Sequence, residues 1–168
     1  MASIEKLIAY MEKIGITEDI PKKYNGGCTY KVEKWGSHYF KNIQISKSGC
    51  IVSFDYESIG YMLCKQKEKM LKKYCSRYGY KVFYESGYPG CFFLWVMPEK
   101  DLDELNDIWT FENNCKSECE LLIHKYHESG RYNSDHARLE NELKAIMSEY
   151  ESSYFEFLKS CNIVQFSA

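Results

Sequence analysis

The pattern of apolar residues predicts an amphipathic helix at the start of the chain. Ser3 is followed by apolar side chains at positions 4, 7, 8, 11 and 14, a spacing that places them on one face of a helix. A serine hydroxyl can accept a hydrogen bond from a free amide of the first turn, so Ser3 is the expected N-cap. Gly15 directly follows the apolar face and is the expected end of the helix.

The next part of the chain has residues typical of strands. Runs of such residues cover positions 29–35, 39–46 and 50–56, and together they predict a three-stranded antiparallel meander. Lys47-Ser48-Gly49 separates the last two runs and predicts a turn with a left-handed glycine. Apolar and polar side chains alternate over residues 50–56, so we expect one face of the sheet on a core and the other in water.

Helical spacing returns over residues 57–78, with Gly79 as the expected stop. Residues 80–85 and 91–97 predict a second hairpin, whose second strand is apolar on both faces and is therefore expected inside the sheet. Beyond Pro98 the pattern is helical, with one or two helices over residues 101–128 and a last helix that begins at Ser134.

These elements predict an α+β fold with the order α-β-β-β-α-β-β-α-α and an antiparallel sheet of about five strands. The sheet domain is expected over residues 1–98. An acidic helical hairpin over residues 99–168 is expected to pack on it or extend from it. Apolar residues of the last helix repeat at alternating spacings of four and three, as in a heptad seam. The seam predicts either an antiparallel contact with the preceding helix or a homodimer through the last helix.

Composition narrows the class of protein. The 168 residues suit one globular domain, or a small domain with a helical appendage. The longest apolar run, residues 91–97, has seven residues, whereas a membrane span needs roughly 20. Most of the eight cysteines occupy positions where a small apolar residue would pack, and the N-terminal segment has no apolar signal core. We therefore expect reduced thiols in a soluble cytoplasmic protein without a membrane partner.

The formal net charge of −2 hides an asymmetry along the chain. Residues 1–82 hold 15 Lys and Arg against 8 Asp and Glu, whereas residues 83–168 hold 7 against 16. The two halves therefore carry +7 and −9. A basic half favours an anionic partner and an acidic half favours a basic one. The alternative is that the halves neutralise each other across an internal interface.

The densest group of cations lies on and just beyond the predicted helix 57–78. At 100° per residue, four of its lysines gather on one side, where they can lie along a phosphate backbone while nearby tyrosines stack on unpaired bases. No pair of arginines is spaced to grip guanine edges, so contact with the backbone is favoured over recognition of a duplex sequence. The candidate nucleic-acid-binding residues are Lys65, Lys69, Lys72, Lys73, Arg77 and Lys81.

Acidic residues of the C-terminal half form a second candidate surface. Carboxylates spread along helices can imitate a row of phosphates and occupy the basic channel of a nucleic-acid enzyme, as in small phage-encoded inhibitors. Alternatively, acids at a helix start only stabilise the helix N-terminus. The candidate partner-binding residues are Asp103, Glu104, Asp107, Glu142, Glu149, Tyr150 and Phe157.

The order helix, three strands, helix over residues 3–78 is similar to that of double-stranded-RNA-binding domains. In that family the second helix opens with a lysine-rich signature, whereas here the helix opens at Glu57 and its lysines come two turns later. The resemblance therefore implies a similar arrangement of elements and no function. The segment from Ile20 to Gly27 also resembles the start of one family of immunity proteins.

Catalytic and metal-binding patterns are weak. Cys115, Cys119, His124 and His127 lie close in sequence, but His124 is about 140° around a helix from Cys119, which does not favour a tetrahedral zinc site. No motif of a serine nucleophile or of a phosphate-binding loop is present, and no cofactor is expected. Cys28 or Cys91, each beside a glycine, would be the nucleophile of a thiol-dependent enzyme if a histidine met it in space.

These features predict a small, non-catalytic intracellular binding protein. It would act through charge-polarised surfaces on nucleic acid or on a nucleic-acid-processing protein, in the manner of an inhibitor from a phage or mobile element. The alternatives are a protein-interaction or dimerisation module, such as an immunity protein, and a small thiol-dependent enzyme.

Overall fold

A computed structural model describes residues 1–21, 23, 26–36 and 45–162. The chain divides into two compact units. Unit 1 comprises Met1–Trp35 and Lys47–Glu104, and unit 2 comprises Gly36–Ser46 and Leu105–Ala168. Each unit is described by itself below.

Unit 1 has a five-stranded sheet with the strand order β1-β2-β3-β5-β4. Strand β1 is parallel to β2, whereas β5 is antiparallel to both β3 and β4. The sheet is therefore mixed and mostly antiparallel, which confirms the predicted α+β class and places β5 inside the sheet as expected. Its elements are α1 (Ile4–Lys13), β1 (Thr17–Glu18), β2 (Cys28–Gly36), β3 (Ser46–Asp55), α2 (Tyr56–Ile59), α3 (Tyr61–Tyr78), β4 (Tyr80–Tyr88) and β5 (Cys91–Pro98).

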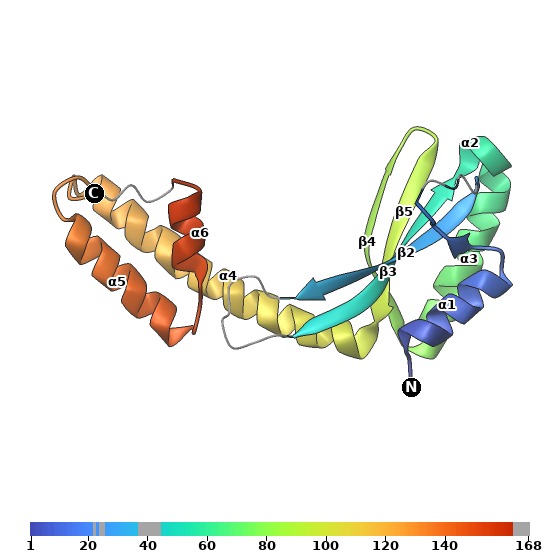
Figure 1. Cartoon of the computed structure of the whole chain (residues 1–168), viewed down its shortest axis with the longest axis horizontal. Helices are drawn as coiled ribbons and strands as arrows, with labels where there is room; N and C mark the ends of the chain where they lie inside the picture. The colour runs from blue at the N-terminus through green and yellow to red at the C-terminus, as the bar shows by residue number, and fades with distance from the viewer. Residues whose placement is uncertain (22, 24–25, 37–44, 163–168) are drawn as a thin grey trace. The chain divides into compact units, whose positions relative to one another are not determined.

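Helices α1 and α3 lie on the same side of this sheet (Figure 1). Their buried side chains, including Leu7 of α1 and Leu71 of α3, form one core with the strand residues Val52, Phe54 and Leu94. Val52 pairs with Leu94 across β3 and β5, and Phe54 pairs with Phe92 of β5. The alternation of apolar and polar residues in β3 therefore has its predicted effect, because every second side chain enters the core.

The predicted ends of α1 are confirmed. The Ser3 side chain accepts a hydrogen bond from the Lys6 amide, as an N-cap does. Helix α1 ends at Lys13, and Gly15 has a φ of +83°, a conformation that glycine adopts without steric cost.

The predicted turn at Lys47-Ser48-Gly49 is wrong, because β3 runs through these residues. A Cβ atom at Gly49 would lie 2.7 Å from the Val96 carbonyl oxygen and 2.9 Å from the Trp35 ring. Glycine is needed here for the close approach of neighbouring strands and not for a left-handed turn. The strand predicted over residues 39–46 lies outside the described residues except for its last two positions, and the short β1 was not predicted.

The single helix predicted over residues 57–78 is interrupted. Gly60 has a φ of +93° and separates the one-turn helix α2 from α3. Helix α3 then ends as predicted at Gly79, whose φ is +80°. The break changes the direction of the chain before the lysine-rich segment begins, so the cations all belong to α3 and the strand that follows it.

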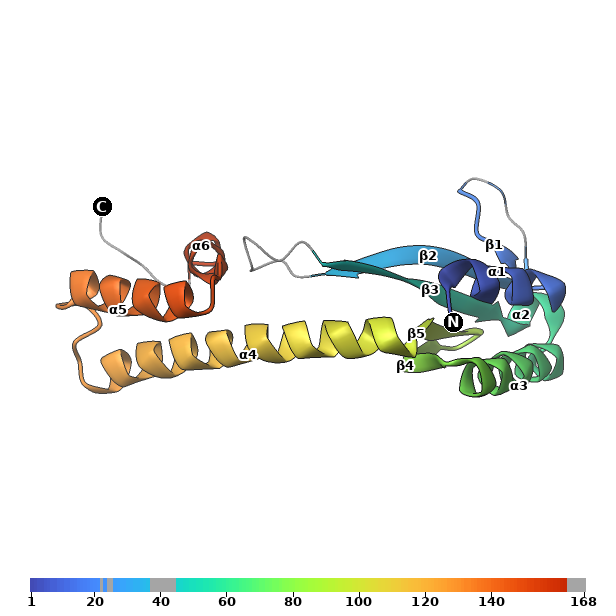
Figure 2. The same cartoon turned by 90° about the horizontal axis from the view of Figure 1, so that it is seen from below.

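Unit 2 is built on one long helix, α4 (Glu99–Glu128), which begins in unit 1. Figure 2 shows α5 (His136–Glu149) alongside the C-terminal half of α4. Leu139 and Leu143 of α5 are fully buried in one cluster with Cys119 and Ile123 of α4, so the apolar seam is used within the chain. The heptad pattern predicted one helix from Ser134 to Phe157, which is wrong. Helix α5 ends at Glu149, and Tyr150 is its C-cap. The separate helix α6 spans Tyr154–Ser160 and contains Phe157.

The sheet core of unit 1 sets its stability. Phe54 is fully buried, and its ring stacks on that of Phe92 at 4.6 Å between centroids. We expect Phe54→Ala to lower the free energy of unfolding by about 3–5 kcal/mol, because it removes a large side chain and leaves a cavity. Urea titration followed by circular dichroism measures this change. The control Val32→Ala, at a side chain 40% exposed on β2, should change it by less than about 0.5 kcal/mol. Equal losses in the two variants would contradict this account of the core.

Candidate nucleic-acid interface

The six cations predicted to bind nucleic acid fall into two groups, those in ion pairs with carboxylates and those outside such pairs. Glu68 of α3 is only 8% exposed, and it pairs with Lys65 at 2.8 Å and with Lys72 at 3.0 Å. Lys72 also pairs with Glu85 of β4 at 2.7 Å. Two of the six cations are therefore neutralised inside unit 1 by Glu68 and Glu85, and the buried carboxylate of Glu68 is not left unpaired.

Three of the other candidate cations form an exposed stripe on α3. Lys69, Lys73 and Arg77 follow one another at spacings of four residues, so successive charges lie about 6 Å apart along the helix. All three are exposed, and the described residues offer no carboxylate partner to Lys69 or Lys73. Lys81 is exposed on β4 next to Val82, whose side chain packs on the core. Lys81 therefore projects from the other face of the sheet and is not brought together with the stripe.

A groove between α1 and α3 places this stripe beside a stack of tyrosines. The rings of Tyr10 and Tyr74 are parallel within 5°, with their centroids 3.8 Å apart. Tyr78 is the next ring, with its centroid 4.6 Å from that of Tyr74 and its plane tilted by 41°. The cavity has a volume of about 460 Å³ and is lined by Tyr10, Lys13, Met70, Lys73, Tyr74, Arg77 and Tyr78.

Hydrogen bonds from side chains to main-chain carbonyls hold the two walls of the groove together. The Tyr10 hydroxyl donates to the Met70 carbonyl of α3, and the Tyr74 hydroxyl donates to the Lys6 carbonyl of α1. The Lys67 ammonium of α3 donates to the carbonyl oxygens of Ile14 and Gly15, at 2.8 and 3.0 Å. These carbonyls lie at the C-terminal end of α1, where a positive charge is favourable, so Lys67 fixes α1 against α3.

The electrostatics of the groove are one-sided. Among the described residues that line it, three are cations and none is a carboxylate. Glu12 of α1 lies elsewhere, because its carboxylate accepts a hydrogen bond from Tyr30 of β2 at 2.9 Å. Burial, followed by the neighbouring Cys75 and Tyr74, raises the pKa of Tyr10, so this ring stays neutral at physiological pH. The arrangement can bind phosphates by charge and planar bases by stacking.

The predicted acidic surface is partly neutralised and is divided between the units. Glu104 of unit 1 pairs with Lys47 at 2.6 Å, and Glu142 of unit 2 pairs with Arg138 at 3.1 Å. Asp103, Asp107 and Glu149 are exposed. The remaining two residues face their own unit: the Tyr150 hydroxyl donates to Glu118, and Phe157 packs against the core of unit 2. This set therefore does not form one row of free carboxylates.

The cysteine and histidine candidates for a metal site have other contacts. Cys115 and Cys119 are buried in the core of unit 2, whereas His124 pairs with Glu128 and His127 stacks on Tyr132. Within the described ranges no group of three or more His, Cys, Asp or Glu side chains could hold a metal ion. All eight cysteines are free thiols and seven are buried, which confirms the expected packing role of most of them.

Sequence reasoning missed the α1 wall of the groove. Lys6, Tyr10 and Lys13 are spaced by four and three residues, which places them on one face of α1, beside its apolar face. That spacing was readable in the sequence. The contact of this face with α3 was not, because it depends on how both helices pack on the sheet.

Comparison with known proteins identifies no relative. No protein-family model, curated protein or solved structure matches the chain. Every helix in the described part of the chain is too short or too polar to span a bilayer.

Thiol reactivity tests the alternative of a cysteine-dependent enzyme. Cys161 is the exposed thiol, whereas burial raises the pKa of Cys28, Cys50 and Cys75 to about 12. In the Cys161→Ser variant we expect uniformly slow alkylation by iodoacetamide at neutral pH, because thiols at such pKa values hold almost no thiolate. Mass spectrometry over a time course measures the labelling. Rapid modification of one site in the folded variant would instead support a reactive, catalytic cysteine.

Proposed function

We propose that unit 1 binds single-stranded nucleic acid in the groove between α1 and α3, without catalysing a reaction on it. The observation that carries the proposal is the combination, in one groove, of stacked tyrosines with cations that pair with no carboxylate in the part of the chain that the structure describes. Proteins that bind single strands without sequence preference use the same two components: a positive groove along the backbone and aromatic rings on which bases stack.

The position of the rings favours a single strand over a duplex. Bases must be unpaired and splayed to reach aromatic side chains, whereas the bases of a duplex are already stacked on one another. Tyr74 is enclosed by Tyr10, Tyr78 and Tyr80. Tyr78 is 51% exposed at the end of this series, so its ring is the platform for an incoming base. The Arg77 guanidinium lies over the Tyr78 ring, 5.5 Å from its centre, so this cation is close to any base that stacks there.

Charge reversal at the groove tests the electrostatic part of the proposal. We expect Lys73→Glu with Arg77→Glu to abolish binding of a fluorescein-labelled oligonucleotide of mixed sequence, measured by fluorescence anisotropy at low salt. For the unmodified protein, log Kobs should fall with log[salt] with a slope of about −0.7 per neutralised phosphate. The three cations of the groove together with Lys69 would give a slope near −3.

The matched control carries the same change of charge on unit 2. Lys125→Glu with Lys159→Glu also replaces two exposed cations by glutamates, at sites outside the groove. This variant should keep most of the affinity. Equal loss in both variants would assign binding to net charge alone and would refute the groove, as would undiminished binding of the groove variant.

Substitution of Tyr78 tests the stacking part. We expect Tyr78→Leu to weaken binding of the single strand by about 5- to 150-fold, because a stacked base contributes about 1–3 kcal/mol. The side chain is half exposed, so the melting temperature should change little. Tyr84→Leu on β4 is the control, since Tyr84 is similarly exposed at 56% and does not line the groove. Anisotropy titrations should show weaker binding for Tyr78→Leu than for Tyr84→Leu. Equal affinities of the Tyr78→Leu and Tyr84→Leu variants would show that Tyr78 does not contribute to binding.

A further inference from the structure

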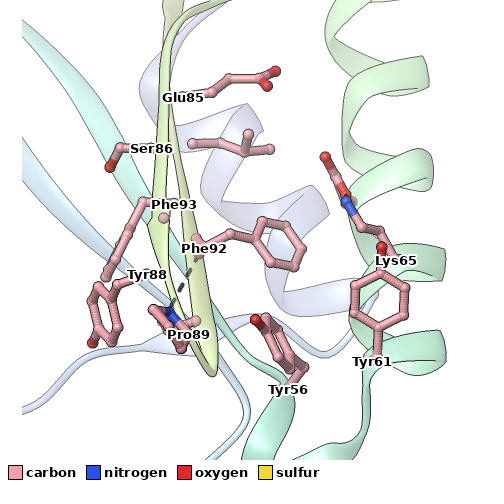
Figure 3. A pocket seen from close by; sticks show the side chains of 13 residues that line it. Tyr56, Tyr61, Lys65, Glu85, Ser86, Tyr88, Pro89, Phe92 and Phe93 are labelled. Atoms are coloured by element: carbon pink, nitrogen blue, oxygen red, sulfur yellow. Dashed lines mark hydrogen bonds and ion pairs between the residues drawn. The ribbon is translucent and has the colours of Figure 1, made fainter.

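Helix α3 also borders a second cleft, which opens toward the hairpin of β4 and β5. The cleft has a volume of about 580 Å³, within the range of sites for small ligands. Figure 3 shows Phe92 pointing from β5 toward α3, whereas Phe93 and Ser86 point to the other side of the hairpin. The wall that faces α3 is therefore aromatic, and Tyr56 and Tyr61 complete it from α2 and α3.

The ammonium of Lys65 occupies one part of this cleft. Its nitrogen lies 4.5 Å from the centre of the Phe92 ring and 5.5 Å from that of Tyr61. It also donates to the buried carboxylate of Glu68 at 2.8 Å. Aromatic faces together with a carboxylate form the type of cage in which proteins recognise ammonium ligands. The chain thus holds a primary ammonium of its own in such a cage.

The cage is rigid. The inner face of the Phe92 ring stacks on Phe54 in the core, which leaves the other face for a cation. Tyr56 meets Tyr61 edge to face at 5.5 Å, and the Tyr56 hydroxyl accepts a hydrogen bond from the Gly90 amide at 2.9 Å. These contacts hold the rings of Phe92 and Tyr56 without help from Lys65, so this part of the cage persists when that side chain leaves.

The charge of the cleft allows one cation to replace another. Its lining contains Lys65 and the carboxylates of Glu68 and Glu85, and Lys72 pairs with these carboxylates at 3.0 and 2.7 Å. Glu68 keeps a second partner in Lys72 when Lys65 moves away, which removes the cost of leaving a buried carboxylate unpaired. The side chain of Lys65 is 42% exposed and can swing into solvent. An incoming ammonium can therefore exchange with Lys65 at no net change of charge in the cage.

We propose that this cleft binds an alkylammonium group, such as a lysine side chain of a partner, and that Lys65 is its internal competitor. The proposal is independent of nucleic-acid binding, because the cleft and the groove between α1 and α3 share no lining residue. It assigns to Lys65 the control of access to the cleft instead of contact with phosphates.

The test removes the competitor and supplies a small probe. Lys65→Met keeps the length of the side chain and deletes the ammonium. We expect this variant to bind n-butylammonium chloride about tenfold more tightly than the unmodified protein, because a tethered competitor acts at an effective concentration in the millimolar range. NMR titration of the Phe92 and Tyr61 ring signals measures the affinity, with sodium chloride at equal ionic strength and uncharged 1-butanol as reference ligands.

Two further variants make the outcome decisive. Lys69→Met, the same substitution on the exposed stripe, should leave the affinity unchanged. Phe92→Leu in the Lys65→Met background should abolish the gain, provided that circular dichroism shows the variant to be folded. Acetyl-lysine methylamide and spermidine then distinguish a peptide lysine from a free polyamine, and binding of either supports the site. If Lys65→Met binds n-butylammonium no better than Lys69→Met does, or binds 1-butanol equally well, the proposal is refuted.

Discussion

The surface of unit 1 depends on the burial of one carboxylate. Glu68 lies on α3 with an exposed fraction of 8%, where an unpaired charge would cost several kcal/mol. Burial alone would raise its pKa, but the hydrogen bonds from Lys65 and Lys72 outweigh that effect and hold the pKa below its usual range. The two lysines on the side of Glu68 are thereby neutralised. Those on the neighbouring stripe keep their charge, and so α3 presents a neutral aromatic cleft beside a basic groove.

Features decided by neighbouring residues could be predicted from the sequence. The Ser3 cap and the stop at Gly79 depend on a few positions of the same segment, and both are present. The roles of Gly49 and Gly60 were not predictable in this way. Gly49 is required by the carbonyl oxygen of Val96, 47 positions away in the chain, and Gly60 redirects the chain inside a pattern that is helical throughout. The same limit applies to the groove, since the stacking of Tyr10 on Tyr74 joins two helices that are far apart in the sequence.

The charge asymmetry of the sequence is weaker in the folded units. A cut after Val82 separates +7 from −9, but β4, β5 and the first turns of α4 belong to unit 1 together with their acidic side chains. Unit 1 therefore has 15 Lys and Arg against 13 Asp and Glu, and unit 2 has 7 against 11, so the units carry +2 and −4. Exposed charges interact only within about 10 Å at moderate salt. What a ligand meets is thus decided by local pairing, as between Lys47 and Glu104, more than by the total of either unit.

The hydrogen bonds of the stacked tyrosines affect how the groove would bind a single strand. The hydroxyls of Tyr10, Tyr74 and Tyr80 each donate to a main-chain carbonyl, so these rings are already fixed in their stack. When a base joins the stack at Tyr78, these side chains therefore lose little conformational entropy. The cations lie at the edge of these rings: Lys73 is on an exposed helix face, and the Arg77 guanidinium lies over the Tyr78 ring. Fixed rings with cations beside them hold the bases in place without specifying their order, which suits a site that accepts any sequence.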